Sequence, residues 1–456
     1  MNTLIWFQRD LRIHDHPGLR YAIEKRQPII AVYIYSPKED APWADGAASR
    51  WWLHHSLQKH AEQLESLNIK LHYFKADSVE KIQKFTQAHQ VDTVIWTNRH
   101  EPHRKLLEDK LEQTLSTDNI DVKRFKDELL GNPDVFLTAS KQTPYRVFTP
   151  FYRKLRRELT LSTMLPSSVF RDDTNTDSSA VLKDSQTLQH LQLLDKHHWH
   201  KKLHTHWTPG ETEAQRKLDC FVASILIDYD KQRDFPATKG TSGLSPHLHF
   251  GEISPRQIVN TLAPLIDFEG GVIAQAAESF LRQLIWREFA RYILWHFPET
   301  VNQPMNNKYK PEFWKTNNKL LAQWQQGKTG FTIIDAGMTE LWQSGSMHNR
   351  VRMLTASLLT KNMGIDWQQG ARWFWDTLVD ADLANNTMGW QWVAGCGVDA
   401  APYFRIFNPE TQAIKFDKQQ HYRKQWLRTT TPVLQPVIEL SQSREEALYR
   451  YREFIK

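Results

Sequence analysis

Apolar residues in the first 130 positions gather in short runs that are separated by longer amphipathic stretches. The runs are rich in β-branched and aromatic residues, which suit the pleated, half-buried surface of a strand. The stretches between them repeat apolar residues every three or four positions, as helices do. Strands that alternate with helices predict a parallel, doubly wound sheet of Rossmann-like class. The expected strands are Leu4–Phe7, Ile29–Ile34, Lys70–Phe74 and Thr93–Trp96, and the expected helices include Ala48–Leu67 and Pro102–Leu115.

The pattern changes farther along the chain. Residues 131–205 contain polar and turn-forming clusters that predict a connector. Beyond it the apolar positions follow the helical period, most clearly in Ala276–Phe297, Asn349–Asn362 and Trp367–Leu378. At 456 residues the chain is long enough to bury more than one core. We therefore expect an α/β domain at 1–130, the connector at 131–205 and a larger all-α domain at 206–456.

Composition places the chain among globular proteins, with 40% hydrophobic and 24% charged residues. No stretch approaches the roughly 18 consecutive apolar residues of a membrane span, and the N-terminus lacks the apolar run of a signal peptide. The two cysteines, Cys220 and Cys396, lie far apart and outside any CxxC pattern, which favours reduced thiols over a disulfide or a zinc site. We expect a cytoplasmic, monomeric protein without a membrane partner.

The formal net charge of +6 supports a polyanionic partner only weakly. The distribution of the basic residues is more informative than their sum. They cluster at Tyr152–Arg157, Lys231–Arg233 and Arg350–Arg352. The first cluster fits a solvated helix face as well as it fits a binding surface.

Residues 380–392 combine two carboxylates, two asparagines and two indoles. In a helix, Asp382, Asn386 and Trp390 would recur at every fourth position and share one face. An acid, an amide and an oxidisable aromatic ring on one face suit a redox cofactor better than an ordinary core. Tryptophan is also concentrated here, since 11 of the 18 indoles lie at or beyond Trp286.

Two helical segments each place an amide beside a guanidinium and a large apolar side chain. Together they could line a cavity for a flat molecule with polar edges. Either set alone fits an amphipathic helix with polar residues at its rim. The sets are Gln283, Trp286 and Arg287, and Asn349, Arg352 and Met353.

The turn Lys239–Pro246 is rich in small and hydroxyl-bearing residues and precedes a helical stretch. Its hydroxyls and free backbone N–H groups could hold a phosphate. A plain helix cap is the alternative, because Ser-Pro commonly begins helices. The turn alone leaves both interpretations open.

Taken together, these motifs resemble the photolyase/cryptochrome family over nearly the whole chain. Seven ordered matches carry the resemblance, and their order makes it specific. They are Trp6–Arg12, Phe148–Phe151, Arg233–Pro236, Gly240–Pro246, Ile285–Phe289, Met347–Met353 and Asp380–Asn408.

The resemblance implies FAD bound inside the helical domain. Asp380 would pair with Arg352 and remain ionised, and Asn386 would face the reactive N5 edge of the flavin. A neutral amide there, where plant cryptochromes carry Asp, favours repair over signalling. The implied cofactor contacts are Tyr229, Thr241, Ser242, Leu244, Ser245, Arg287, Asn349, Arg352, Asp380, Asp382 and Asn386.

The family also implies an electron relay and a substrate cavity. Trp390, Trp367 and Trp314 would carry electrons from the surface to photoexcited FAD, although indoles also simply fill large cores. The implied reaction is light-driven splitting of cyclobutane pyrimidine dimers, and it needs no metal. A lesion flipped out of UV-damaged DNA would meet Gln283, Trp286, Asn349, Met353, Asn386 and Trp392. DNA contacts would come from Arg233, Gln283, Trp286 and Arg350.

Gln283 departs from the family pattern, because photolyases that repair dimers usually carry Glu there. Gln can donate a hydrogen bond but has no acidic proton to share. The (6-4) photolyases often have Gln at this position, yet they carry a His in the region where this chain reads His348-Asn349-Arg350. Repair of cyclobutane dimers is the first expectation. A (6-4) photolyase and a cryptochrome-like blue-light photoreceptor remain open.

The second chromophore of the family, an antenna, is harder to assign. His103-Arg104 stands where relatives that bind folate show Asn-Glu. Methenyltetrahydrofolate, an 8-hydroxy-deazaflavin and an empty site all remain possible from the sequence.

Overall fold

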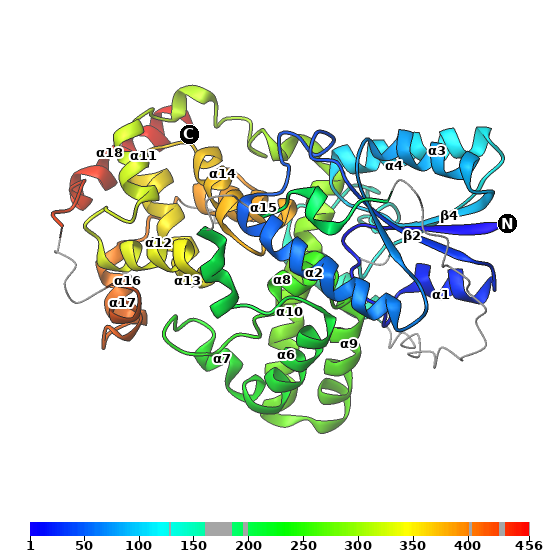
Figure 1. Cartoon of the computed structure of the whole chain (residues 1–456). Helices are drawn as coiled ribbons and strands as arrows, with labels where there is room; N and C mark the ends of the chain where they lie inside the picture. The colour runs from blue at the N-terminus through cyan, green and yellow to red at the C-terminus, as the bar shows by residue number, and fades with distance from the viewer. Residues whose placement is uncertain (127–128, 160–184, 195–198, 401–403, 428–433, 456) are drawn as a thin grey trace.

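The computed structural model describes residues 1–126, 129–159, 185–194, 199–400, 404–427 and 434–455. A sheet domain lies at one end of the molecule and α11, α12, α16, α17 and α18 lie at the other, with α8, α10 and α15 between them (Figure 1). The expected α/β domain followed by a larger helical domain is confirmed.

The N-terminal domain is a five-stranded parallel sheet in the order β3-β2-β1-β4-β5. Each crossover between neighbouring strands runs through a helix, as in doubly wound sheets. The strands are β1 (Asn2–Phe7), β2 (Ile29–Tyr35), β3 (Leu71–Lys75), β4 (Val91–Thr97) and β5 (Asp121–Phe125). The helices are α1 (Pro17–Glu24), α2 (Ala47–Glu65), α3 (Ser78–Ala88) and α4 (Pro102–Thr117).

Alternation along β1 explains how the sheet is covered on both faces. Leu4 and Trp6 face a core shared with α3 and α4, whereas Ile5 and Phe7 face a second core shared with α1 and α2. All four predicted strands are present. The sequence analysis missed β5, because this edge strand is only partly buried and alternates charged with apolar residues.

The C-terminal domain is built from helices. Its predicted helices are present, but Asn349–Asn362 is α13 followed by a π-helix rather than one α-helix. Among the described residues, no helix combines the length and apolarity that a membrane crossing requires. The helices are α5 (Phe148–Glu158), α6 (Glu211–Ser224), α7 (Tyr229–Gln232), α8 (Ser245–Phe250), α9 (Pro255–Pro264), α10 (Gly271–His296), α11 (Asn318–Gln325), α12 (Thr332–Ser344), α13 (Asn349–Ser357), α14 (Trp367–Thr377), α15 (Leu383–Ala394), α16 (Pro409–Phe416), α17 (His421–Trp426) and α18 (Leu440–Phe454).

Part of the expected connector belongs to the helical core. Phe148 and Phe151 of α5 are buried in the same cluster as Phe289 of α10. The polar stretch at 172–179 lies outside the described residues.

The two domains meet where the strand β1 ends. Gly251, which follows α8, has a φ of +68°, and a side-chain carbon there would lie 1.9 Å from the carbonyl oxygen of Arg9. Leu11 donates its backbone N–H to the carbonyl of Phe250 at 3.2 Å, and Arg12 donates to the carbonyl of Gly251 at 3.0 Å. Only glycine permits this approach. The helical domain therefore packs against the carboxyl edge of the sheet.

Candidate functional site

An ion pair joins two of the segments that the sequence analysis singled out. Arg352 of α13 donates from Nη2 to both carboxylate oxygens of Asp380, at 3.1 and 3.0 Å. Ser245, at the start of α8, donates its hydroxyl to the same carboxylate at 2.5 Å, across 135 residues of sequence. The predicted pairing of Arg352 with Asp380 is confirmed, and Ser245 completes a three-residue cluster.

Helix α15 has open space beside Asn386. A side-chain carbon built at Gly389 would meet no atom within 4 Å, although α15 packs against α10, α13 and α14. Gly389 lies one turn after Asn386, so both belong to the same side of the helix. The Asn386 amide donates to the carbonyl of Ala371 at 2.9 Å, which sets its orientation. Gly389 is exposed, so this side of α15 is accessible to a ligand.

The turn before α8 brings hydroxyl groups close to a lysine. Thr241 is exposed, and Ser242 accepts a hydrogen bond from the backbone N–H of Leu244 at 3.3 Å. A side-chain carbon at Gly243 would lie 3.3 Å from Nζ of Lys217. Burial lowers the pKa of Lys217, and an anion beside it would restore the charged form. The sequence analysis missed Lys217, which no motif marks, yet its place beside the hydroxyls suits a phosphate.

Other residues predicted to contact the cofactor lie around the same helices. Tyr229 is buried, with its ring 5.4 Å from that of Phe280. Leu244 is also buried. Arg287 of α10 donates to the carbonyl of Leu248 at 3.2 Å and so links α10 to α8. These residues frame the cluster around Asp380, and their roles at the cofactor stay predictions.

Two half-exposed indoles are held in fixed orientations. Trp286 of α10 stacks on Phe148, with ring centroids 3.5 Å apart and planes 7° from parallel. Trp392 of α15 donates its indole N–H to the carbonyl of Asp399 at 3.1 Å. Each indole therefore has one fixed partner and remaining free surface. The other residues predicted to meet the substrate, Gln283, Asn349 and Met353, are partly or fully exposed as well.

The three indoles of the predicted relay occupy adjoining segments. The Trp390 ring lies so close to α14 that a side-chain carbon at Gly370 would be 2.1 Å from it. Trp367 is the first residue of α14. The backbone just after Trp314 bridges to Ile365, two residues before Trp367. Trp390 and Trp367 are 3% and 1% exposed, whereas Trp314 is only partly buried, so the series leads from the interior toward solvent.

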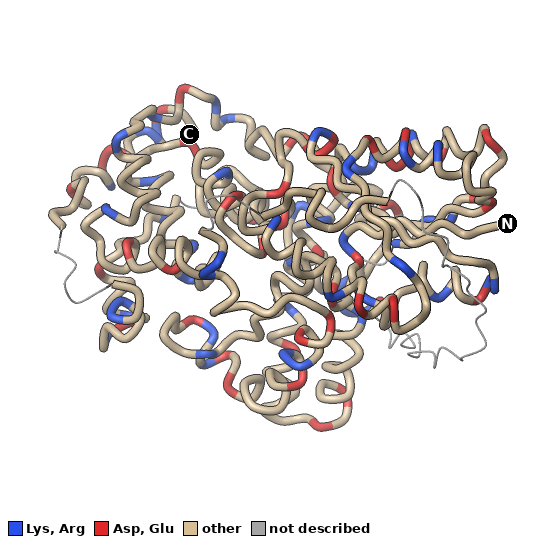
Figure 2. The backbone as a smooth tube through the Cα atoms, in the orientation of Figure 1, with Lys and Arg blue, Asp and Glu red and all other residues tan. Residues whose placement is uncertain are grey.

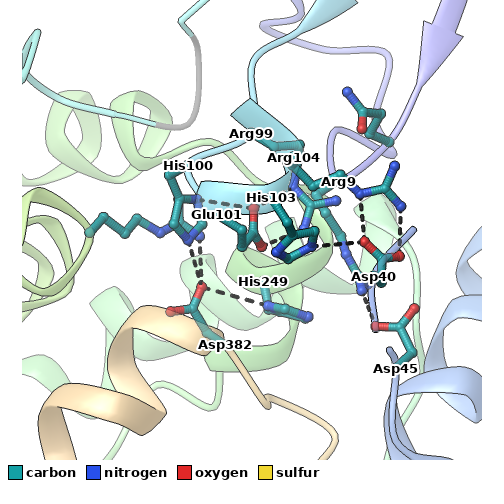
Figure 3. Close-up of polar contacts among 12 residues, drawn as sticks. Arg9, Asp40, Asp45, Arg99, His100, Glu101, His103, Arg104, His249 and Asp382 are labelled. Atoms are coloured by element: carbon teal, nitrogen blue, oxygen red, sulfur yellow. Dashed lines mark hydrogen bonds and ion pairs between the residues drawn. The ribbon is translucent and has the colours of Figure 1, made fainter. Parts of the chain in front are cut away.

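Asp382 requires a correction. It precedes α15 as its N-cap, and its Oδ1 accepts the backbone N–H of Asn385 at 2.9 Å. The other oxygen contacts Arg291 of α10 at 3.1 Å and lies 3.7 Å from both His100 and His249 (Figure 3). The prediction that Asp382 shares one helical face with Asn386 and Trp390 is therefore wrong, because extended backbone directs its carboxylate away from that face.

The charge of Asp382 is compensated by other side chains of the protein. Burial alone would raise the pKa of Asp382, but the Arg291 guanidinium and two imidazoles hold it well below its usual range. Burial and the nearby Arg9 lower the pKa of His249. His100 belongs to the sheet domain, and its neighbour Glu101 pairs with Arg99 at 2.5 Å. The cluster thus ties the sheet domain to the start of α15.

The sequence analysis missed Arg291 and His100. Arg291 is a charged residue within an otherwise apolar part of α10, which was a usable signal because such a residue is rarely buried without a partner. His100 follows β4 at the carboxyl edge of the sheet, where doubly wound domains place functional residues. Neither signal indicates that the side chain contacts Asp382.

The expected DNA-contacting arginines are already engaged within the protein. Arg350 pairs with Asp234 at 2.7 Å and lies 4.4 Å from the centre of the Phe416 ring. Arg233 lies over the Tyr229 ring at 5.1 Å. Lys and Arg are interspersed with Asp and Glu along both domains (Figure 2). The distribution of charge alone therefore does not define a DNA-binding face. The DNA contacts of Arg233 and Arg350 stay predictions.

His103 and Arg104 are both directed at Asp40. Arg104 donates from Nε and Nη2 to the two carboxylate oxygens at 2.6 Å each, and His103 lies 3.0 Å from Oδ1 (Figure 3). These contacts hold the pKa of Asp40 below its usual range against the effect of burial. The two residues that replace the Asn-Glu pair are therefore part of an internal ion cluster.

Comparison with known proteins agrees with this arrangement. The chain matches a family described as DNA photolyase over residues 3–169 and one described as the FAD binding domain of DNA photolyase over residues 280–453. It is 39% identical to a deoxyribodipyrimidine photo-lyase of Agrobacterium fabrum, over 93% of this chain and 86% of the relative. A class III photolyase structure from Agrobacterium tumefaciens superposes with a TM-score of 0.89 at 36% identity, covering 99% of this chain and 97% of that one. A cryptochrome structure from Synechocystis gives a TM-score of 0.85 at 26% identity, covering 100% and 99%.

Proposed function

The chain belongs to the photolyase/cryptochrome family and carries its FAD-binding domain; on that premise we propose that it is a deoxyribodipyrimidine photolyase. The proposed reaction splits cyclobutane pyrimidine dimers in UV-damaged DNA with light. Reduced FAD supplies a photoexcited electron when bound, and the protein binds, orients and shields the reacting groups.

Two partly exposed indoles with fixed orientations carry this proposal. Trp286 is fixed by its stack on Phe148, and Trp392 by its hydrogen bond to Asp399. A flipped-out dinucleotide offers two flat faces and an apolar ring between them, so rigid aromatic walls recognise it at low entropic cost. Signalling through a partner protein would not require such walls.

The residues around Asp380 are proposed to hold the cofactor. The carboxylate is fixed by Arg352 and Ser245, so its orientation is set before any ligand enters. Asn386 would present a neutral amide to the flavin edge, which suits a reduced ring. Thr241, Ser242 and Lys217 would bind the phosphates.

Trp390, Trp367 and Trp314 are proposed to carry electrons to the bound flavin. Their support is the continuity of the segments that bear them and the partial exposure of Trp314 at the outer end of the series, next to two buried indoles. An electron donor in solution can reach the partly exposed Trp314 without entering the core.

A (6-4) photolyase is the less favoured alternative because of His348. This residue is the N-cap of α13, and its Nδ1 accepts the backbone N–H of Arg350 at 3.2 Å. Burial lowers the pKa of His348 to about 4, so the ring is neutral near pH 7. Because burial disfavours its protonated form and its Nδ1 caps α13, His348 is a poor proton donor to a lesion.

The proposed activity is tested by illuminating the reduced, FAD-loaded protein with an oligonucleotide that carries one thymine dimer. We expect loss of the dimer in blue or near-UV light and no loss in the dark. An oligonucleotide with a (6-4) lesion serves as the control and should remain unchanged. Repair of the (6-4) lesion alone would assign the alternative, and repair of neither would exclude both repair activities.

Gln283 supplies a sharper test of lesion recognition. Gln283→Glu should preserve or raise the quantum yield of dimer repair, because a carboxylic acid both donates a hydrogen bond and shares its proton. Gln283→Leu, which removes the hydrogen bond at similar volume, should lower repair about tenfold. The yields are measured from dimer loss per absorbed photon. A large loss in Gln283→Glu would contradict this view of the site.

A further inference from the structure

A cleft lies between the C-terminal end of α15, the segment that follows it and α18. None of the residues proposed to bind FAD lines it, and Trp392 is the one residue it shares with the proposed lesion site. Four aromatic side chains and three polar ones line it. The aromatic walls are Trp392, Phe404, Phe407 and Tyr451, and the polar residues are Lys361, Tyr309 and Arg405.

The Lys361 and Tyr309 polar groups both lie against the backbone of Gly395. Gly395 follows α15 with a φ of +86°. A side-chain carbon there would lie 2.9 Å from Nζ of Lys361, 3.2 Å from Oη of Tyr309 and 3.5 Å from the Phe404 ring. An ammonium donor, a hydroxyl donor and a ring face thus gather around one residue, where only glycine leaves them room.

Among the described residues, Tyr309 has no hydrogen-bond partner and Lys361 has no ion-pair partner. Tyr309 is 3% exposed and its hydroxyl forms no hydrogen bond there. Lys361 is 1% exposed, lies 3.1 Å from the centre of the Phe404 ring and forms no ion pair in that part of the chain. A buried lysine without a counter-ion is rare, because desolvation of the charged form is costly.

Within the described part of the chain, the groups that act on Lys361 are positive or neutral. Cys396 is a buried thiol whose pKa burial raises, so it stays protonated. Arg450 of α18 donates to the carbonyl of Lys361 at 2.9 Å and brings a second cation. Arg405 lines the same cleft. The C-terminal carbonyls of α15 supply only about half a negative charge. Burial, reinforced by the Arg450 guanidinium, accordingly lowers the pKa of Lys361 well below its usual range.

We propose that this cleft binds a small planar organic anion of the benzoate type. Its carboxylate would lie between Nζ of Lys361 and Oη of Tyr309, and its ring would lie against the aromatic walls. The anion supplies the missing counter-charge, and the two charge-assisted hydrogen bonds satisfy both donors. Aromatic contact supplies the remaining affinity and selects a flat body over a compact inorganic ion.

The probe is sodium benzoate, titrated by calorimetry into the FAD-loaded full-length protein. We expect one saturable site and net proton uptake, visible as a heat that changes with the ionisation enthalpy of the buffer. Lys361→Met, which keeps the apolar stem, should weaken binding at least about tenfold. Lys81→Met is the matched control, because Lys81 also lies over an aromatic ring, 4.2 Å from that of Phe74, but in the sheet domain.

Several outcomes would overturn the site. They are the absence of saturable binding, equal affinity in Lys361→Met, and equal binding of neutral benzamide. If Lys361→Met does not fold or retain FAD, Tyr309→Phe decides, with an expected loss of about threefold or more. Because DNA repair does not enter these readouts, failure here would leave the proposed photolyase activity untouched.

Discussion

Trp390→Phe is expected to slow light-driven reduction of the bound flavin by at least about a hundredfold, which corresponds to about 2.7 kcal/mol of activation barrier. An indole is oxidised much more readily than a phenyl ring, so phenylalanine removes the electron carrier while keeping most of the packing. Trp390 is the indole whose ring lies against Gly370 of α14, the helix that begins with Trp367. Flavin absorbance under continuous blue light, with a thiol as the external donor, measures the rate.

Trp324→Phe is the matched control for this prediction. Trp324 is fully buried in the same core, its ring centroid lies 6.1 Å from that of Trp390, and its indole N–H donates to the carbonyl of Thr355 at 3.0 Å. The control loses an indole of equal size next to the same ring but outside the proposed relay. It should reduce the flavin within about twofold of the unchanged protein. Similar slowing in both variants would show that packing, and not the relay, sets the rate.

Features that depend on neighbouring residues in the sequence could be predicted from the sequence. The strand Leu4–Phe7 was recognisable because a strand buried on both faces reads as a continuous apolar run. The pairing of Arg352 with Asp380 was implied by the family resemblance, and it agrees with the need of a buried carboxylate for a partner. β5 was missed because Arg124 on it pairs with Glu108, Asp109 and Glu112, so that polar residues mask the strand pattern.

Long-range contacts explain what the sequence did not reveal. Asp382 was predicted to face the cofactor by helical spacing, yet its backbone is extended and its carboxylate meets His100 of the other domain. Nothing near either residue in the sequence indicates the other. The cleft at Lys361 likewise forms from segments that only the fold brings together. Spacing rules predict neighbours within an element, whereas contacts between elements depend on how the elements pack.

Asp382→Ala is expected to lower the free energy of unfolding by about 3–5 kcal/mol. The substitution removes the carboxylate that Arg291, which is 1% exposed, contacts at 3.1 Å, and loss of one partner of a buried ion pair is more costly than loss of a surface pair. It also removes the N-cap of α15, worth about 1 kcal/mol. Urea unfolding of the FAD-free protein, followed by circular dichroism, measures the loss.

Asp366→Ala separates the two contributions. Asp366 is the N-cap of α14, where it accepts the backbone N–H of Gln368 at 3.1 Å, and it forms no ion pair with any described residue. Its loss should therefore cost about 1 kcal/mol, the value of a cap alone. A loss in Asp382→Ala no greater than this would mean that Arg291 finds another partner or water.

The position of His100 leads to a further prediction, which concerns whether the two domains unfold cooperatively. Asp382 contacts His100 from the sheet domain and Arg291 from the helical domain, so its carboxylate stabilises the interface as well as α15. If such contacts make the two domains unfold together, Asp382→Ala should broaden the urea transition or divide it into two. The apparent dependence of the unfolding free energy on urea concentration should then decrease. Asp366→Ala should shift the midpoint and keep a single transition. Coincident single transitions for both variants would show that the other contacts between the domains, such as those of Asp15 with Ser254 and Arg256, are enough to couple them.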